Sequence, residues 1–161
     1  MKHTISAMVE NKPGVLARMA SLFSRRGFNI DSLAVSETEN PGISRMTITV
    51  QGDELTLEQI CNQIMKLIDV IEVIDHTKDV YVARELCLCK VDCTPQTRAE
   101  IMSICQIFRG DIVDVASETM ILQITGSGDK VDAFIDLIRG VGMQEMVRTG
   151  KILLVRGEKQ T

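Results

Sequence analysis

The amino-acid sequence predicts an α+β protein built from two βαββαβ units, each an antiparallel sheet with helices on one face. Three observations predict this class. Strand-like alternation and helix-like spacing of apolar residues follow each other in the same order in both halves. The first helix of each half ends near a glycine and is followed by a strand. A short polar joint, residues 76–79, separates the halves. We therefore expect one domain over residues 1–77 and a second over residues 78–161.

The elements of the first half follow from residue spacing. Residues 2–9 alternate and predict a strand. Apolar residues between 14 and 26 recur at helical spacing, and Gly27 supplies the left-handed stop that commonly ends a helix. The remaining expected elements are strands over 29–37 and 46–50, a turn at 40–42, a helix over 55–68 and a strand over 70–75.

The second half repeats this order. Residues 80–93 predict a long strand, and a helix should start near Thr94, with Thr94 as its cap and Pro95 in its first turn. The remaining expected elements are strands over 111–117 and 119–126, a helix around 131–138 and apolar strand material over 143–155.

The connections between these elements predict the strand order. Right-handed crossovers place the first and third strands of each half at the centre of its sheet and the second strand at an edge. In the first half this edge strand, residues 29–37, carries Ile30, Leu33 and Val35. An apolar unpaired edge favours pairing with a second copy, so we expect a homodimer whose sheet continues across a two-fold axis.

Composition excludes several classes of function. The chain has 161 residues, a net charge of −4 and only 3% aromatic residues, so it lacks the basic and stacking surfaces of a nucleic-acid binder. No apolar run is long enough for a membrane span or a secretion signal. We therefore expect a cytoplasmic protein that binds neither nucleic acid nor membrane.

Five cysteines without a secretion signal are typical of reduced thiols. Cys87, Cys89 and Cys93 lie on one face if their segment is a strand. Their C-x-C-x3-C spacing lacks the fourth ligand of a structural zinc site. We expect these cysteines to pack as small apolar residues under a helix and assign no metal site, with zinc binding as the alternative.

The turn after the first strand is the best candidate for a binding site. Residues 10–16 read E-N-K-P-G-V-L and open a helix whose first N–H groups have no internal acceptor. Such groups favour a small carboxylate, and Gly14 lets a ligand approach the backbone. Asn29 and Asp31 can meet the ammonium group of an amino acid, and the nearby aliphatic side chains favour an aliphatic one. The candidate ligand-binding residues are Asn11, Gly14, Val15, Leu16, Asn29, Ile30 and Asp31.

An ordinary strand-to-helix turn explains the same loop without a ligand, because Pro and Gly are common in such turns. The sequence offers no nucleophile–base pair, so no catalytic residue is assigned and a metabolite sensor is favoured over an enzyme. His3 and His76 are expected on the surface or at strand ends, without a carboxylate partner. Arg25 and Arg26 can bind phosphate, but basic residues at a helix end are also expected from the helix dipole alone.

Several segments resemble one known family. They are E-N-K-P-G-V-L at 10–16, L-F-S-R-R-G-F-N-I-D-S-L at 22–33, S-R-M-T at 44–47, V-A-R-E-L at 82–86, I-F-R-G-D-I-V-D-V at 107–115 and K-V-D-A-F at 130–134. Spread over nearly the whole chain, these segments are similar to the regulatory small subunit of acetohydroxyacid (acetolactate) synthase. The first half resembles an ACT domain. Lys12-Pro13 and the cysteine-rich strand depart from the usual pattern of the family.

The resemblance implies two ferredoxin-like domains and a protein that is not itself an enzyme. It implies binding to the catalytic large subunit, activation of that subunit, and feedback inhibition by valine held between paired ACT domains, in branched-chain amino-acid biosynthesis. Thiamine diphosphate, FAD and Mg²⁺ are then expected on the catalytic subunit, and no cofactor in this chain. Carried over by position, the ligand motif is Asn11, Gly14 and Asn29. The alternative is a stand-alone ACT-type amino-acid sensor that regulates another metabolic enzyme.

Overall fold

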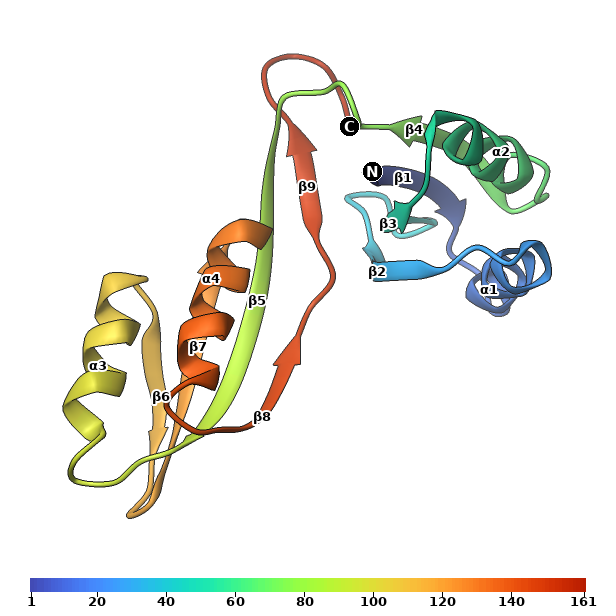
Figure 1. The fold of residues 1–161 in the computed structure, drawn as a ribbon. Helices are drawn as coiled ribbons and strands as arrows, with labels where there is room; N and C mark the ends of the chain where they lie inside the picture. Colours follow the sequence, from blue (N-terminus) through green and yellow to red (C-terminus); the bar gives the residue numbers. More distant parts are fainter. The chain divides into compact units, whose positions relative to one another are not determined.

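The computed structural model describes all residues from Met1 to Thr161 (Figure 1). In chain order its elements are β1 (Lys2–Glu10), α1 (Val15–Arg26), β2 (Ile30–Glu37), β3 (Ile43–Gln51), α2 (Glu54–Ile64), β4 (Val70–Asp75), β5 (Tyr81–Asp92), α3 (Arg98–Ile107), β6 (Asp111–Val115), β7 (Thr119–Gly126), α4 (Gly128–Arg139), β8 (Met143–Arg148) and β9 (Ile152–Val155). The predicted order βαββαβ occurs twice and is followed by one further strand. No helix is long and apolar enough to cross a membrane.

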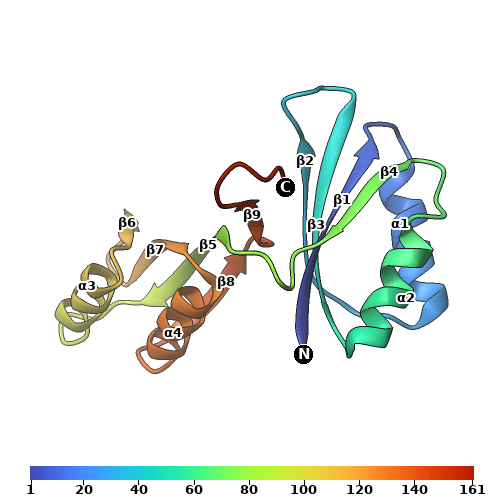
Figure 2. The same ribbon diagram turned by 90° about the horizontal axis from the view of Figure 1, so that it is seen from above.

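The first sheet has the strand order β2-β3-β1-β4, and its neighbouring strands are antiparallel. This confirms that β1 and β3 are central and that β2 is an edge strand. Helices α1 and α2 cover one face of the sheet (Figure 2). The core between them is formed by Ile5, Ala7, Val9, Val15, Met19, Leu22, Phe23, Met46, Ile48, Val50, Leu57, Ile60 and Ile64.

The second sheet repeats this plan with the order β6-β7-β5-β8, and β9 also pairs with β5. Helices α3 and α4 cover one of its faces (Figure 2). The predicted fold class, two ferredoxin-like units, is therefore confirmed. Cys87, Cys89 and Cys93 are at most 1% exposed and belong to the core of this sheet together with Cys105. The prediction that they pack as small apolar residues is also confirmed.

The chain divides into two compact units, and one of them is discontinuous. Residues Met1–Val82 and Gly150–Thr161 form the first unit, and Ala83–Thr149 form the second. This division differs from the expected boundary after residue 77, because β5 begins in the first unit and the chain returns to that unit after β8. The N–H of Arg156 donates to the carbonyl of Val80 at 2.9 Å, which ties the returning residues to the first unit.

Two helix ends show how the repeat is built. Gly27 follows α1 with φ 71°, as predicted, and its N–H and that of Phe28 donate to carbonyls of the last turn of α1. After α3 the same bonds are made by Arg109 and Gly110, but the left-handed residue is Arg109, with φ 54°. Gly110 is needed for another reason, because a Cβ there would lie 2.8 Å from the carbonyl oxygen of Gln123.

Three predicted boundaries were wrong. Helix α2 ends at Ile64 and not at residue 68, and Ile68 is 93% exposed. Helix α3 begins at Arg98, so Thr94 and Pro95 lie in a preceding turn, in which the carbonyl of Thr94 accepts from the N–H of Arg98 at 3.0 Å. The strand expected over 143–155 is two strands, β8 and β9.

Candidate functional site

The turn that joins β1 to α1 presents unused backbone donors. Gly14 is the N-terminal cap of α1 and adopts φ 86°, a left-handed conformation that favours glycine. No side chain caps the helix, and its first turn contains no acidic residue. The first N–H groups of a helix have no acceptor within it, and the helix dipole makes this end positive. The turn can therefore hold a small anion such as a carboxylate.

An ion pair lies beside this turn. Arg18 Nε donates to Asp69 Oδ2 at 2.6 Å, and the hydrogen bond from Arg18 lowers the pKa of Asp69. Asp69 is 6% exposed. A Cβ built on Gly14 would lie 2.8 Å from Arg18 Nη1, so the guanidinium lies against Gly14. Neither Arg18 nor Asp69 is predicted from the sequence, because the two residues are 51 positions apart in the chain.

Asn11 is held by the end of the β2–β3 hairpin. Its Nδ2 donates to Glu37 Oε1 at 3.0 Å and to the carbonyl of Pro41 at 2.9 Å. The side-chain oxygen of Asn11 has no partner among these bonds and remains a free acceptor. Asn11 can therefore order the loop and still present one polar atom to a ligand.

The predicted site residues form two groups, one in the turn at residues 11–16 and one at residues 29–31. The two groups lie at opposite ends of the first sheet. Ile30 on β2 pairs with Val50, which on its other side pairs with His3 near the start of β1. The turn that contains Gly14 follows the other end of β1. Asn29, which donates to Asp31 Oδ1 at 3.3 Å, therefore does not reach Gly14 within one copy of the chain.

The apolar members of the predicted site have different roles. Val15 is 4% exposed and belongs to the core, so its side chain cannot contact a ligand. Ile30 is half-buried and packs against the same core. Leu16 is 47% exposed and is the aliphatic side chain that the turn itself offers.

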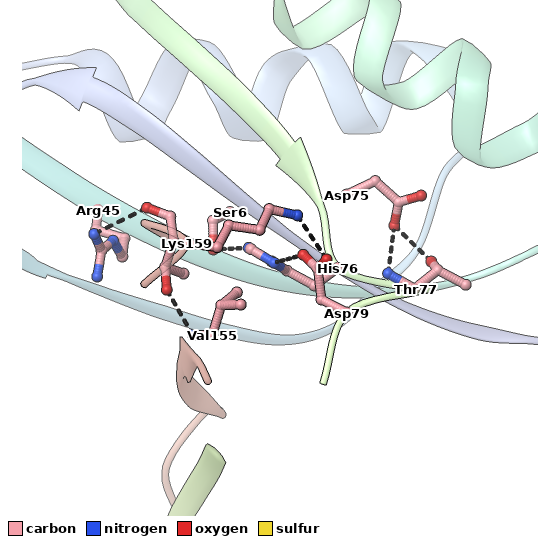
Figure 3. A network of polar contacts seen from close by, with 9 residues as sticks. Ser6, Arg45, Asp75, His76, Thr77, Asp79, Val155 and Lys159 are labelled. Carbon is pink, nitrogen blue, oxygen red and sulfur yellow. Dashed lines mark hydrogen bonds and ion pairs between the residues drawn. The ribbon is translucent and has the colours of Figure 1, made fainter. Parts of the chain in front are cut away.

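Both histidines lie at strand ends, as expected, but they are buried and not on the surface, and His76 has a carboxylate partner. His3 is 1% exposed and His76 is 0% exposed. His76 Nδ1 donates to Asp79 Oδ2 at 3.0 Å, and its Nε2 lies 2.9 Å from Ser6 Oγ (Figure 3). This Ser–His–Asp order resembles a catalytic relay, but Ser6 is 1% exposed and cannot meet a substrate.

The remaining candidate side chains, two arginines and the cysteines, are hydrogen-bonded or buried within the protein. Arg26 Nη2 donates to Gln63 Oε1 at 3.2 Å, and Arg25 Nε donates to the carbonyl of Ser21 at 3.4 Å. Burial raises the pKa of the Cys61 thiol to about 11 and that of Cys89 to about 12, which disfavours the thiolate that metals bind. No group of three or more His, Cys, Asp or Glu side chains is placed to hold a metal ion.

Comparison with known proteins finds a matching family model for each half of the chain. A family model described as the AHAS small subunit-like ACT domain matches residues 5–72, and one described as the small subunit of acetolactate synthase matches residues 84–157. The chain belongs to the family of acetolactate synthase small subunits. The predicted resemblance is therefore confirmed.

Individual members of the acetolactate synthase small-subunit family match over 81% or more of their own length. The probable acetolactate synthase small subunit of Archaeoglobus fulgidus is 54% identical, over 99% of this chain and 100% of its own. That of Aquifex aeolicus is 47% identical, over 96% of this chain and 81% of its own. The crystal structure of the small subunit from Thermotoga maritima matches with a TM-score of 0.89 and 42% identity, over 99% of both chains.

Proposed function

We propose that this chain is the non-catalytic regulatory subunit of acetolactate synthase, that it activates a catalytic large subunit in the cytoplasm, and that it makes that subunit sensitive to valine. Membership of the small-subunit family supports the regulatory role. The single observation that carries the ligand assignment is the uncapped start of α1 at Gly14, which offers backbone donors and a positive dipole end to a carboxylate.

The ligand site is completed by a second copy of the chain. Antiparallel pairing of β2 with its symmetry mate brings the start of one β2 to the end of the other. Asn29 and Asp31 of one copy then approach the Gly14 turn of its partner, although they lie far from their own turn. Two equivalent sites form at the dimer interface, each with a carboxylate end at Gly14 and an ammonium end at Asp31.

Valine acts by favouring one arrangement of the ACT pair. A ligand shifts an equilibrium only through its different affinity for two states, and coupling of this kind is worth about 1–3 kcal/mol. The chemistry takes place on the catalytic subunit with thiamine diphosphate, FAD and Mg²⁺, and this chain contributes no reacting group.

Reconstitution with a catalytic subunit, with and without valine, tests the proposal. We expect the wild-type chain to raise acetolactate formation and valine to reduce it. Titration calorimetry of the isolated chain should show heat of binding with valine. If neither valine, leucine nor isoleucine binds, the ligand assignment is wrong.

Gly14→Asp tests the ligand site separately from activation of the catalytic subunit. Its carboxylate stands beside the free amides and the Arg18 guanidinium. It therefore competes with the carboxylate of the ligand for these groups and repels it, and like-charge contacts at a binding site cost several kcal/mol. We expect valine affinity to fall by about a hundredfold or more while activation is kept. Gly14→Asn is the matched control, because it adds the same volume without the charge and asparagine tolerates positive φ. Equal valine inhibition in wild type and Gly14→Asp contradicts the assignment.

A further inference from the structure

The residues that follow β8 and Thr149 have no role in the proposed function. We call Gly150–Thr161, which includes β9, the return segment, because it leaves the second unit and belongs to the first. The chain end in this segment lies on the face of the first sheet that α1 and α2 do not cover (Figure 2). The return segment therefore contacts the ACT sheet from the side opposite to the helices.

Gly150 packs directly on the main chain of the edge strand β2. A Cβ built on Gly150 would lie 2.6 Å from the carbonyl carbon of Leu33 and 2.9 Å from the amide nitrogen of Ala34. Backbone atoms cannot rotate aside as the end of a flexible side chain can. Ser32 and Ala34 are small, which leaves room for this approach. A displacement of β2 toward its open face must therefore move Gly150.

The far end of the return segment is anchored by polar contacts (Figure 3). Lys159 Nζ pairs with Asp79 Oδ1 at 2.6 Å, and the other oxygen of Asp79 accepts from the buried His76. Arg45 Nη2 donates to the main-chain oxygen of Thr161 at 3.3 Å. Together with the packing of Gly150, these contacts hold the segment at three places on the first unit: on β2 at Gly150, on β3 at Arg45 and after β4 at Asp79.

The residue before Gly150 is fixed in the second unit. Thr149 donates its N–H to the carbonyl of Leu86 at 2.9 Å, and the N–H of Leu86 donates to Thr149 Oγ1 at 2.9 Å. Within two consecutive residues the chain passes from a two-bond contact with β5 to a main-chain contact with β2.

We propose that Gly150 transmits the state of β2 to the second unit and is a positioning residue for feedback inhibition, not a ligand-binding residue. The inference rests on the proposed function, in which β2 pairs with a second copy and opens with Asn29. A change in that pairing moves Leu33 and Ala34, moves Gly150, and reaches the Leu86–Thr149 contact. Loss of the Gly150 contact should therefore leave valine binding in place and remove the response to it.

The full-length Gly150→Ala variant tests this, reconstituted with the catalytic subunit. The added methyl group must push the return segment off β2, so amide hydrogen exchange should become faster in residues 30–37 and 150–161. We expect valine affinity by calorimetry to stay within about threefold of wild type, and activation without valine to be kept. The valine concentration that gives half inhibition should rise about tenfold or more, within the range of allosteric coupling.

Gly140→Ala is the matched control, because Gly140 has φ −70° and a Cβ there meets only the carbonyl oxygen of Leu137, at 3.4 Å. It should behave as wild type. Lys159→Met is a second variant that removes the ion pair with Asp79, one anchor near the other end of the return segment, without adding a group beside β2. It should also weaken inhibition while binding is kept, so the inference remains testable if Gly150→Ala does not fold.

Two results would overturn the inference alone. One is unchanged exchange of the return segment in Gly150→Ala, which contradicts the tight packing. The other is a loosened segment with wild-type inhibition, which shows that the contact carries no signal. Failure of the wild-type chain to bind any branched-chain amino acid overturns the proposed function and this inference together, and the wild-type calorimetry distinguishes that case.

Discussion

Arg18 and Asp69 form an ion pair beside the candidate site. The contribution of this pair to the stability of the folded protein should depend on pH. The pKa of Asp69 in the folded chain lies below its ordinary value of 3.8, chiefly through the hydrogen bond from Arg18. A carboxyl with a lowered pKa in the folded state stabilises the protein above its unfolded pKa. That stabilisation is lost as the pH falls through the folded pKa.

We therefore predict that Asp69→Asn lowers the urea midpoint of unfolding at pH 7 and at pH 5. The difference from wild type should shrink as the pH falls below 3.8. Glu145→Gln is the control, because its pair with Lys90 is longer, 3.4 Å, and Glu145 is 70% exposed. A difference between Asp69→Asn and wild type that is the same at pH 7 and pH 2 would contradict this account.

At the scale of residues, the sequence predicts backbone roles better than side-chain partners. The strand-to-helix turn at Gly14 and the helix stop at Gly27 were predicted correctly because both are local features. The partner of Arg18 and the burial of His76 depend on residues that are distant in sequence, so no local pattern indicates them. Asn11 was predicted as a ligand residue, and its bonds to the β2–β3 hairpin could not be foreseen for the same reason.

At the scale of elements, apolar spacing alone overestimates helix length. Helix α2 should have continued through Leu67 and Ile68 by that pattern, but it ends at Ile64, and Met65 and Lys66 lead into a turn. Leu67 still packs against the core, whereas Ile68 points to solvent and is 93% exposed. The pattern cannot distinguish a helical stripe from apolar residues that follow its end.

The two isoleucines give a direct test of this difference in burial. Ile64 is 0% exposed, so Ile64→Ala should lower the free energy of unfolding by about 2–5 kcal/mol through lost burial and a cavity. Ile68→Ala removes the same atoms from an exposed position and should change the free energy of unfolding by less than about 0.5 kcal/mol. Urea unfolding followed by circular dichroism measures both. Similar losses for the two variants would mean that Ile68 is buried and would contradict its exposed position.

The strand order was predictable because it follows from chirality and connection length, not from the chemistry of individual residues. Right-handed crossovers suffice to place β1 and β3 at the centre of the first sheet and β2 at its edge. The pairing of β9 with β5 was not predictable, because it joins residues separated by the whole second unit. The cysteines of β5 were correctly placed from the period of a strand.

At the scale of the whole molecule, the proposed dimer predicts different behaviour of the two edges of the first sheet. Val35 lies on β2 and is 41% exposed, and Ile71 lies on β4 at the opposite edge and is 52% exposed. Lysine on an edge strand disfavours pairing with another chain. Val35→Lys should therefore shift the protein toward monomer in sedimentation velocity, and Ile71→Lys should not.

Valine binding should weaken together with dimerisation in Val35→Lys, because each site draws residues from both copies. Calorimetry at the same protein concentration measures this. A fully dimeric Val35→Lys would show that β2 is not the interface. A monomer that binds valine with wild-type affinity would show that the site is complete within one chain.

The discontinuity of the first unit makes the second unit an insertion, since residues Ala83–Thr149 interrupt it. An expressed fragment that stops at Val82 keeps the four strands, both helices and the core of the first sheet and lacks only the return segment. The points of entry and exit are close, because Leu86 and Thr149 are hydrogen-bonded to each other. Replacing residues 83–149 by a short linker should therefore keep the return segment on the first unit, whereas truncation after Val82 removes it.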